Sequence, residues 1–269
     1  MIFHSQFESV YLWLPIIGFL VGLIGSLIGG GGGFFFIPVL TLLFQVPAQI
    51  ALSTSLAATI PICLVGSVGH YRRGNVDMST ALLFIIAGLF GAFAGAAVTN
   101  LFSNKTLRIS WGIYTILIAI QMLVSNFQKK KDENRGIIRN KSEGFEKITK
   151  GSLFGFVAGI ITSIFGTTGA TPIQAGMFAL RIPIKVVVGT SLVTVLVNTA
   201  SSLGAHSLIG DIDLTLVYFL TGGTVIGSLI GPKILSDAKL DRIESSVRQL
   251  YAFGLIVFGV LMIISNTGN

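Results

Sequence analysis

The chain has 269 residues, of which 52% are hydrophobic and 11% are charged, and its net charge is +7. A water-soluble domain needs a larger polar surface, so this composition excludes a soluble globular protein and indicates an integral membrane protein. Eight of the eighteen basic residues lie in one hydrophilic segment, 126–150. The positive charge therefore indicates a cytoplasmic loop beside anionic lipid and argues against binding of nucleic acid.

The apolar segments follow one another in two similar sets. The first 30 residues lack the basic region of a secretory signal, so we expect the N-terminus to be retained. The long segments of the first half are 11–29, 48–70, 79–102 and 107–126, with a short one at 34–45. The long segments of the second half are 151–167, 186–208, 214–232 and 248–265, with a short one at 171–181. Because one crossing takes about 20 residues, we predict an all-α polytopic membrane protein.

The two halves share a motif. The pattern P-x6-T-S-L-x13-H-x3-G-x2-D begins at Pro47 and again at Pro183, with identical internal spacing. This spacing indicates an internal duplication. We therefore expect a first membrane repeat at 1–128, a basic cytoplasmic linker at 129–150 and a second membrane repeat at 151–269. Duplicated halves are common in secondary transporters.

The charges of the loops select between two topologies. If each short segment crosses the membrane, each half makes five passes and the repeats are inverted; if it is re-entrant, four passes make the repeats parallel. With the linker inside, the five-pass arrangement leaves just Lys105 and Arg108 outside. Because basic loops favour the cytoplasm, we predict inverted repeats with both termini outside. Whether the short helices cross completely stays open at this point.

Each short segment follows a break in the apolar sequence, at the five glycines Gly29–Gly33 and at "FGTTGATP", 165–172. Twelve helical residues rise about 18 Å, which is too little to cross the hydrocarbon core, so we expect half-helices. Broken backbone at membrane depth survives where it lines a cavity, and the N-terminus of a half-helix favours an anion. The predicted substrate-binding residues are Gly30, Gly31, Gly32, Gly33, Thr54, Ser55, Gly166, Thr167, Thr168, Gly169, Gln174, Thr190, Ser191 and Asn198.

The duplicated Thr-Ser pairs carry the strongest expectation among the hydroxyls. Thr54-Ser55 and Thr190-Ser191 follow their short helices at the same distance. We therefore expect them near one site at the midplane, although a hydroxyl in a membrane helix often bonds its own backbone. Two further glycine pairs have the spacing of helix-packing seams, and these are Gly91/Gly95 and Gly227/Gly231.

The titratable residues limit the chemistry. No carboxylate lies inside a predicted span, which argues against a sodium site built on Asp or Glu. We assign proton coupling or gating to the duplicated residues at the ends of two helices, with a helix cap or loop hydrogen bond as the alternative. They are His70, Asp77, His206 and Asp213. The single cysteine, Cys63, excludes a disulfide framework and a cysteine-based metal cluster, and we expect no metal, no cofactor and no catalytic residue.

Arg72 and Arg73 lie in the loop between His70 and Asp77, on the predicted cytoplasmic face. Loop arginines commonly fix topology. Alternatively, the pair attracts anions to the inner mouth, because guanidinium groups suit planar oxyanions. The matching loop of the second half has no such charge, and this asymmetry would favour export.

The glycine-rich break, the "ALSTSL" and "VVGTSL" segments and the "HYRRGNVD" loop resemble the TauE/SafE family of sulfite exporters over about 15–265. The resemblance implies proton-driven transport of small sulfur-containing anions such as sulfite, sulfoacetate or other organosulfonates across a prokaryotic cytoplasmic membrane. In the first half Ser53 stands where the second half has the glycine of Gly-Thr-Ser. The expected partners are the anion, protons and membrane lipid; the oligomeric state is open, with a homodimer as one option.

Three other functions are alternatives to a sulfur-anion carrier. An ion channel is the nearest, because broken helices also build selectivity filters. A carrier for another oxyanion or a carboxylate is equally compatible with hydroxyl and amide ligands. An intramembrane serine hydrolase is disfavoured, since no G-x-S-x-G motif is present.

Overall fold

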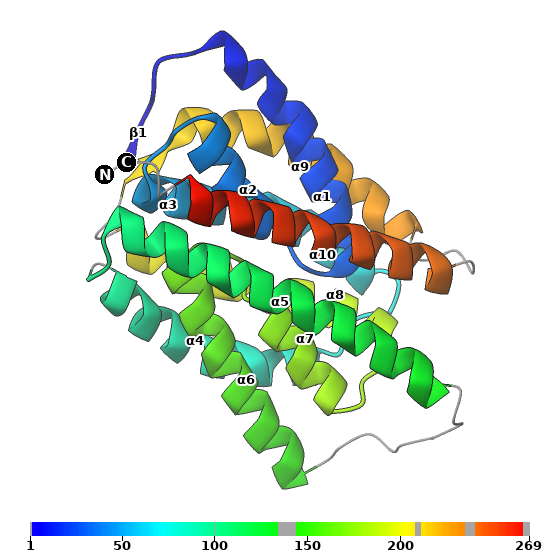
Figure 1. Ribbon diagram of the computed structural model, residues 1–269. Coiled ribbons are helices and arrows are strands. Elements are labelled where there is room, and N and C mark those ends of the chain that lie inside the picture. The colour runs from blue at the N-terminus through cyan, green and yellow to red at the C-terminus, as the bar shows by residue number, and fades with distance from the viewer. Residues whose placement is uncertain (1, 100, 134–143, 208–210, 235–239, 266–269) are drawn as a thin grey trace.

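The computed structural model describes residues 2–99, 101–133, 144–207, 211–234 and 240–265. Ten α-helices account for most of them (Figure 1). In chain order they are α1 (Leu14–Ile28), α2 (Gly33–Pro38), α3 (Ala48–Tyr71), α4 (Met78–Thr99), α5 (Asn104–Glu133), α6 (Gly144–Phe165), α7 (Ala170–Ala179), α8 (Ile184–Ser207), α9 (Leu214–Ile234) and α10 (Leu240–Ile264).

Seven described helices are long and apolar enough to cross a membrane. They are Ser9–Ile28, Ala48–Tyr71, Met78–Thr99, Asn104–Val124, Gly144–Phe165, Ile184–Ser207 and Leu214–Ile234. Two shorter apolar helices are Gly33–Leu43 and Gln249–Ile264, the second being the part of α10 whose side chains are described. Large apolar side chains face outward, with Phe90 exposed by 70% and Ile226 by 57%. Such a surface fits lipid, so this is a multi-pass membrane protein.

The eight predicted long segments correspond to α1, α3, α4, α5, α6, α8, α9 and α10. α5 continues to Glu133 and α6 begins at Gly144, so both helices enter the predicted linker. The apolar run ends earlier than the helix because Lys and Glu also favour helix in water. The central part of the predicted linker, 134–143, lies outside the described residues.

The all-α prediction is confirmed, with one short pair of strands in addition to the helices. β1 (Ile2–Phe3) pairs in parallel with β2 (Ile212–Asp213), where Ile2 faces Ile212. A 3-10 turn, Ser9–Trp13, precedes α1, and a π-helical turn, Val39–Leu43, continues α2. Strand pairing between residues so distant in sequence leaves no trace in local hydropathy.

Helices from the two halves pack against one another rather than forming separate bundles. α1 lies on α9, and its counterpart α6 lies on α4. In the same way α3 contacts α9 while α8 contacts α4, and α3 meets α8 between them. A side chain at Gly227 would overlap the carbonyl oxygen of Phe19, and one at Gly91 would overlap that of Phe156. The interpretation of these glycines as packing seams is therefore confirmed.

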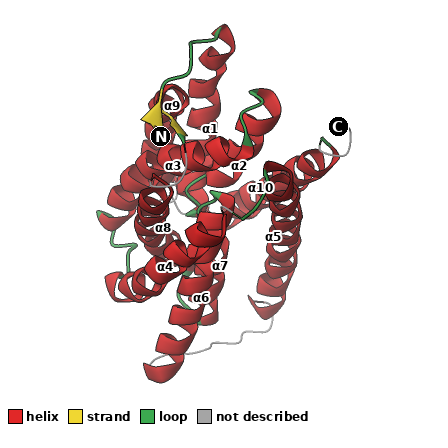
Figure 2. Ribbon diagram, turned by 90° about the vertical axis from the view of Figure 1, so that its left-hand side faces the viewer, coloured by secondary structure: helices red, strands yellow, loops and turns green. Residues whose placement is uncertain are grey.

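α5 and α10 form a separate pair on one side of the molecule (Figures 1 and 2). The two helices run in opposite directions, as the colours of Figure 1 show. Apolar side chains from both helices, among them Met122 and Leu255, pack with Ile28 and Phe34 at the first helix break. This packing places α5 and α10 beside the site described next.

Candidate functional site

Both predicted helix breaks are confirmed. α1 ends at Gly29, whose φ is 76°, and α2 begins after Gly32, whose φ is 82°. In the second half Gly166 has φ 59° and Gly169, which precedes α7, has φ 53°. Side chains rarely tolerate these positive φ values, so glycine is required there. α7 has ten residues, or about 15 Å of helix, which agrees with the predicted half-helix.

The breaks correspond at a spacing of 137 rather than 136 residues: Gly29 matches Gly166 and Gly32 matches Gly169. The same spacing relates Ser26 of α1 to Ser163 of α6. A single spacing of 136 for the whole repeat misses these pairs. The difference arises because the second half has one residue fewer between its break and its Thr-Ser pair.

The duplicated threonines bind the backbone of the opposite half. The Thr190 hydroxyl oxygen accepts a hydrogen bond from the backbone N–H of Asp77 at 2.9 Å. Thr54 accepts one from the N–H of Asp213 at 3.3 Å. Both hydroxyls are fully buried. Each threonine thus fixes the loop that precedes α4 or α9.

The duplicated serines hold the helix breaks. Ser191 Oγ lies 2.9 Å from the carbonyl oxygens of both Gly29 and Val188, so its single proton is shared between the helix break and its own helix. Ser55 Oγ donates to the carbonyl oxygen of Gly166 at 3.1 Å. The carbonyls of Gly29 and Gly166 end α1 and α6, where the helix supplies no partner of its own. Both contacts again run from one half of the chain to the other, so each serine stabilises the helix break of the opposite half.

The two breaks also touch each other. Thr168 Oγ1 donates to the carbonyl oxygen of Gly30. A Cβ atom at Gly31 would lie 2.9 Å from the Thr168 methyl group and 2.7 Å from Cys63 Sγ. Cys63 is fully buried. Gly31 therefore lies in a tight contact between the breaks.

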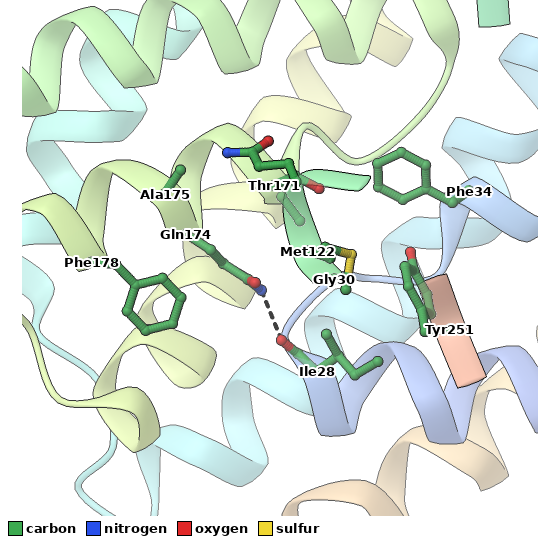
Figure 3. A pocket seen from close by; sticks show the side chains of 11 residues that line it. Ile28, Gly30, Phe34, Met122, Thr171, Gln174, Ala175, Phe178 and Tyr251 are labelled. Carbon is green, nitrogen blue, oxygen red and sulfur yellow. Dashed lines mark hydrogen bonds between the residues drawn. The ribbon is translucent and has the colours of Figure 1, made fainter. Parts of the chain in front are cut away.

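A cavity of about 220 Å³ opens beside this contact (Figure 3). This is far above the roughly 15 Å³ that one water needs. It is lined by Ile28, Gly30, Phe34, Gln121, Met122, Ala170, Thr171, Gln174, Ala175, Phe178 and Tyr251. Of the predicted binding residues, Gly30 and Gln174 line the cavity; the other twelve lie outside its lining.

The polar groups of the cavity come from three elements. Gln174 Nε2, on α7, donates to the carbonyl oxygen of Ile28 at 2.7 Å, which orients its amide (Figure 3). Thr171 stands in the first turn of α7, Gln121 on α5 and Tyr251 on α10. None of the eleven lining residues is charged. The cavity thus offers neutral amides and hydroxyls within mostly apolar walls.

Gln121 and Tyr251 were missed by the sequence analysis. Gln121 has no polar counterpart, since positions 257 and 258 are Val257 and Phe258, whereas Tyr251 matches Tyr114 at the spacing of 137. For Gln121 the only available signal is an amide inside a predicted span, "LIAIQML", because a buried amide in lipid needs a partner.

Asn198 and Thr167 are buried away from the cavity lining. Neither amide atom of Asn198 has a hydrogen-bond partner within the described part of the chain, and Asn198 packs directly against Gly88 of α4. Thr167 Oγ1 likewise has no partner in this part. Their assignment to substrate binding stays a prediction.

The duplicated histidines make equivalent hydrogen bonds within each half. His70 Nε2 lies 3.3 Å from the carbonyl oxygen of Ser26, and His206 Nε2 lies 2.8 Å from that of Ser163. Both rings are buried. They tie the end of α3 to α1 and the end of α8 to α6.

The two aspartates cap helices. Asp77 accepts bonds from the N–H and the hydroxyl of Thr80 at 3.1 and 2.8 Å, at the start of α4. Asp213 accepts one from the N–H of Thr215 at 3.0 Å, at the start of α9. The two aspartates thus form the helix caps, and the two histidines the hydrogen bonds, that the sequence analysis gave as the alternative role. Proton coupling by these four residues stays a prediction.

Arg72 and Arg73 are exposed at the end of α3 and do not line the cavity. Together with Lys233 they line a separate groove between α3 and α9. Attraction of substrate anions by this pair stays a prediction.

Paired helix breaks beside a cavity with a few polar groups, within a helical membrane bundle, are typical of membrane transporters. The sequence profile of the family described as "Sulfite exporter TauE/SafE" matches residues 14–264. The chain therefore belongs to the TauE/SafE family, as the resemblance in the sequence predicted.

Similar proteins carry transporter names. The chain is 31% identical over 221 residues to "Probable membrane transporter protein YdhB" of Bacillus subtilis, covering 81% of this chain and 87% of the relative. It is 30% identical to "Probable membrane transporter protein YunE" of the same organism, covering 83% and 88%. The archaeal "Probable membrane transporter protein MJ0441" of Methanocaldococcus jannaschii is 26% identical, covering 87% and 90%. No solved structure matches the chain.

Proposed function

We propose that this protein is a secondary active carrier that exports small sulfur-containing anions across a prokaryotic cell membrane, coupled to protons. Membership of the family and the cavity between the broken helices support this proposal. The cavity carries most of the argument, because it combines broken backbone at membrane depth with an orienting amide, Gln174.

The cavity suits an anion that must also be released. The first turn of α7 contributes Ala170 and Thr171, and the N-terminus of this helix carries partial positive charge. Gln121, Thr171 and Tyr251 add neutral donors. A fixed arginine or lysine would hold an anion more strongly, and its absence from the lining allows rapid exchange.

The apolar walls favour an organosulfonate with a short carbon chain over bare sulfite. Phe34, Met122 and Phe178 line the cavity. Contact with these apolar side chains would favour binding of a methylene group but not of an oxygen atom. We therefore expect a singly charged alkanesulfonate such as ethanesulfonate to bind more tightly than sulfite.

Inverted repeats would supply the conformational change. α5 and α10, which are counterparts, run antiparallel, and α1 and α6 also point in opposite directions (Figure 1). This arrangement supports five passes in each half and a rocking of one half against the other around the cavity. In this proposal His70 and His206 exchange protons as the cavity changes access.

Flux measurements on the purified protein test the function. In proteoliposomes we expect saturable uptake of labelled ethanesulfonate that depends on an imposed pH gradient. Gln174→Leu should weaken binding by about tenfold, the value of one buried hydrogen bond near 1.4 kcal/mol. Gln49→Leu is the matched control, since Gln49 lies outside the cavity lining.

Non-saturating flux without proton dependence would indicate a channel and contradict the carrier. Equal loss of binding in Gln174→Leu and Gln49→Leu would show that the cavity is not the binding site. If a short carboxylate competes as well as the sulfonate, the proposed substrate class is wrong, but the cavity remains the binding site.

A further inference from the structure

A second hollow lies on the surface between the C-terminal ends of α3 and α9. This groove has a volume of about 560 Å³ and is lined by Leu64, Val65, Val68, Gly69, Arg72, Arg73, Ser228, Leu229, Pro232 and Lys233. Leu64 is 51% exposed, Val68 43% and Leu229 54%. In a membrane protein such apolar surface is covered by lipid.

One end of the groove is basic. Arg72, Arg73 and Lys233 are all exposed there, and none of the ten lining residues is acidic. Arg73 Nη1 donates to the carbonyl oxygen of Gly69 at 2.7 Å, which folds the guanidinium back along α3. A Cβ atom at Gly69 would lie 2.9 Å from Pro232 Cγ, so this glycine is where α3 and α9 approach closely.

We propose that the groove binds one anionic phospholipid. The phosphodiester would lie among Arg72, Arg73 and Lys233, and an acyl chain would run along Leu64 and Val68. Basic pockets between membrane helices select anionic headgroups, and each nearby Lys or Arg adds about 1 kcal/mol of attraction. A free anion would engage just the basic end and leave the apolar walls uncovered, so a lipid matches the whole groove.

The site belongs to one leaflet. Adding or subtracting 136 takes Arg72, Arg73 and Lys233 to Leu208, Ile209 and Ala97, which carry no charge. The repeat therefore duplicates the helices but not the basic end. With inverted repeats, an anionic headgroup would be selected on a single face of the membrane.

Competition between two lipids tests the proposal. The protein is solubilised with equal amounts of phosphatidylglycerol and phosphatidylcholine, and retained lipid is counted by native mass spectrometry. The wild type should retain phosphatidylglycerol preferentially. Replacing all three basic residues by glutamine (Arg72→Gln, Arg73→Gln, Lys233→Gln) should lower this preference on the order of a hundredfold, because three contributions of about 1 kcal/mol are lost.

Two further variants separate charge from shape. Lys105→Gln, Lys150→Gln and Lys185→Gln together remove the same charge elsewhere and should leave the preference unchanged. Val68→Trp fills the apolar part while keeping all three basic residues, and should also reduce retention.

Equal retention of both lipids by the wild type, or an unchanged preference in the Arg72/Arg73/Lys233 variant, would overturn the proposal. So would displacement of phosphatidylglycerol by glycerol phosphate at equal concentration, because that result assigns the site to a free anion. A higher half-saturation constant for ethanesulfonate in the Arg72/Arg73/Lys233 variant than in the wild type, both measured in purely neutral lipid, would likewise assign the basic residues to the substrate.

Discussion

The hydroxyl of Ser191 lies 2.9 Å from the carbonyl oxygen of Gly29, at the residue where α1 ends. Ser191 belongs to the second half of the chain and Gly29 to the first. A side chain that appears by sequence to be a ligand for substrate thus completes the hydrogen bonding of a broken helix.

Ser191→Ala should destabilise the protein. The substitution leaves the buried Gly29 carbonyl without its donor, at a cost of about 1–3 kcal/mol. Thermal unfolding in detergent should show a lower Tm, with further weakening of ligand binding because the adjoining Gly30 lines the cavity. Ser201→Ala is the control, since Ser201 bonds the carbonyl of Val197 within its own helix. Similar Tm values for the two variants would contradict this role.

Thr190→Val should loosen the start of α4. Valine keeps the shape of threonine but cannot accept the bond from the backbone N–H of Asp77, and an unpaired N–H costs about 1–3 kcal/mol. Hydrogen exchange at Asp77 should become faster. In Thr194→Val, by contrast, the lost hydroxyl bonds its own helix, and exchange at Asp77 should stay as in the wild type. Equal protection in both variants would rule out the contact.

Two glycines of α9 should respond to alanine in opposite directions. Alanine at Gly227 would overlap the Phe19 carbonyl and force α1 from α9, costing about 1–3 kcal/mol. At Gly222 no heavy atom lies within 4 Å of the added Cβ, so the same change should stabilise the helix by up to about 1 kcal/mol. Unfolding of both variants in one detergent checks the difference in sign. If Gly227→Ala is as stable as Gly222→Ala, close packing of Gly227 against α1 does not contribute to the stability of the protein.

Labelling of single cysteines tests the inverted repeats. With Cys63 replaced, a membrane-impermeant maleimide should reach Lys185→Cys and Glu146→Cys from the cytoplasm and Lys105→Cys from outside. All three positions lie at or near helix ends in the described part of the chain. Labelling of Lys185→Cys from outside would exclude the five-pass arrangement and favour re-entrant short helices.

The helices and their breaks follow from local properties of the sequence. Apolar length predicts the eight long helices, and glycine predicts the breaks because positive φ at Gly29 and Gly166 is a local requirement. Contacts between the halves depend on segments far apart in the chain. The duplicated Thr-Ser pairs therefore predicted a shared role, and their serines contact the helix breaks; their binding of substrate stays a prediction.

The cavity itself was only partly predictable. Gly30 was expected from the break and Gln174 from its position in α7, and both line the cavity. Gln121 and Tyr251 join them because α5 and α10 pack beside the first break. The packing of α5 and α10 depends on side chains along the whole of both helices, so no short sequence motif predicts it.

The packing of α1 on α9 has a consequence for synthesis of the protein in the cell. α1 is translated early, but the partner that fits Gly18 and Gly22 is α9, which emerges near the end of translation. Membrane insertion and helix association must therefore be separate stages for this chain. A ribosome that stalls before α9 would release an inserted α1 that lacks its closest neighbour, whereas α4 and α6 would already have each other.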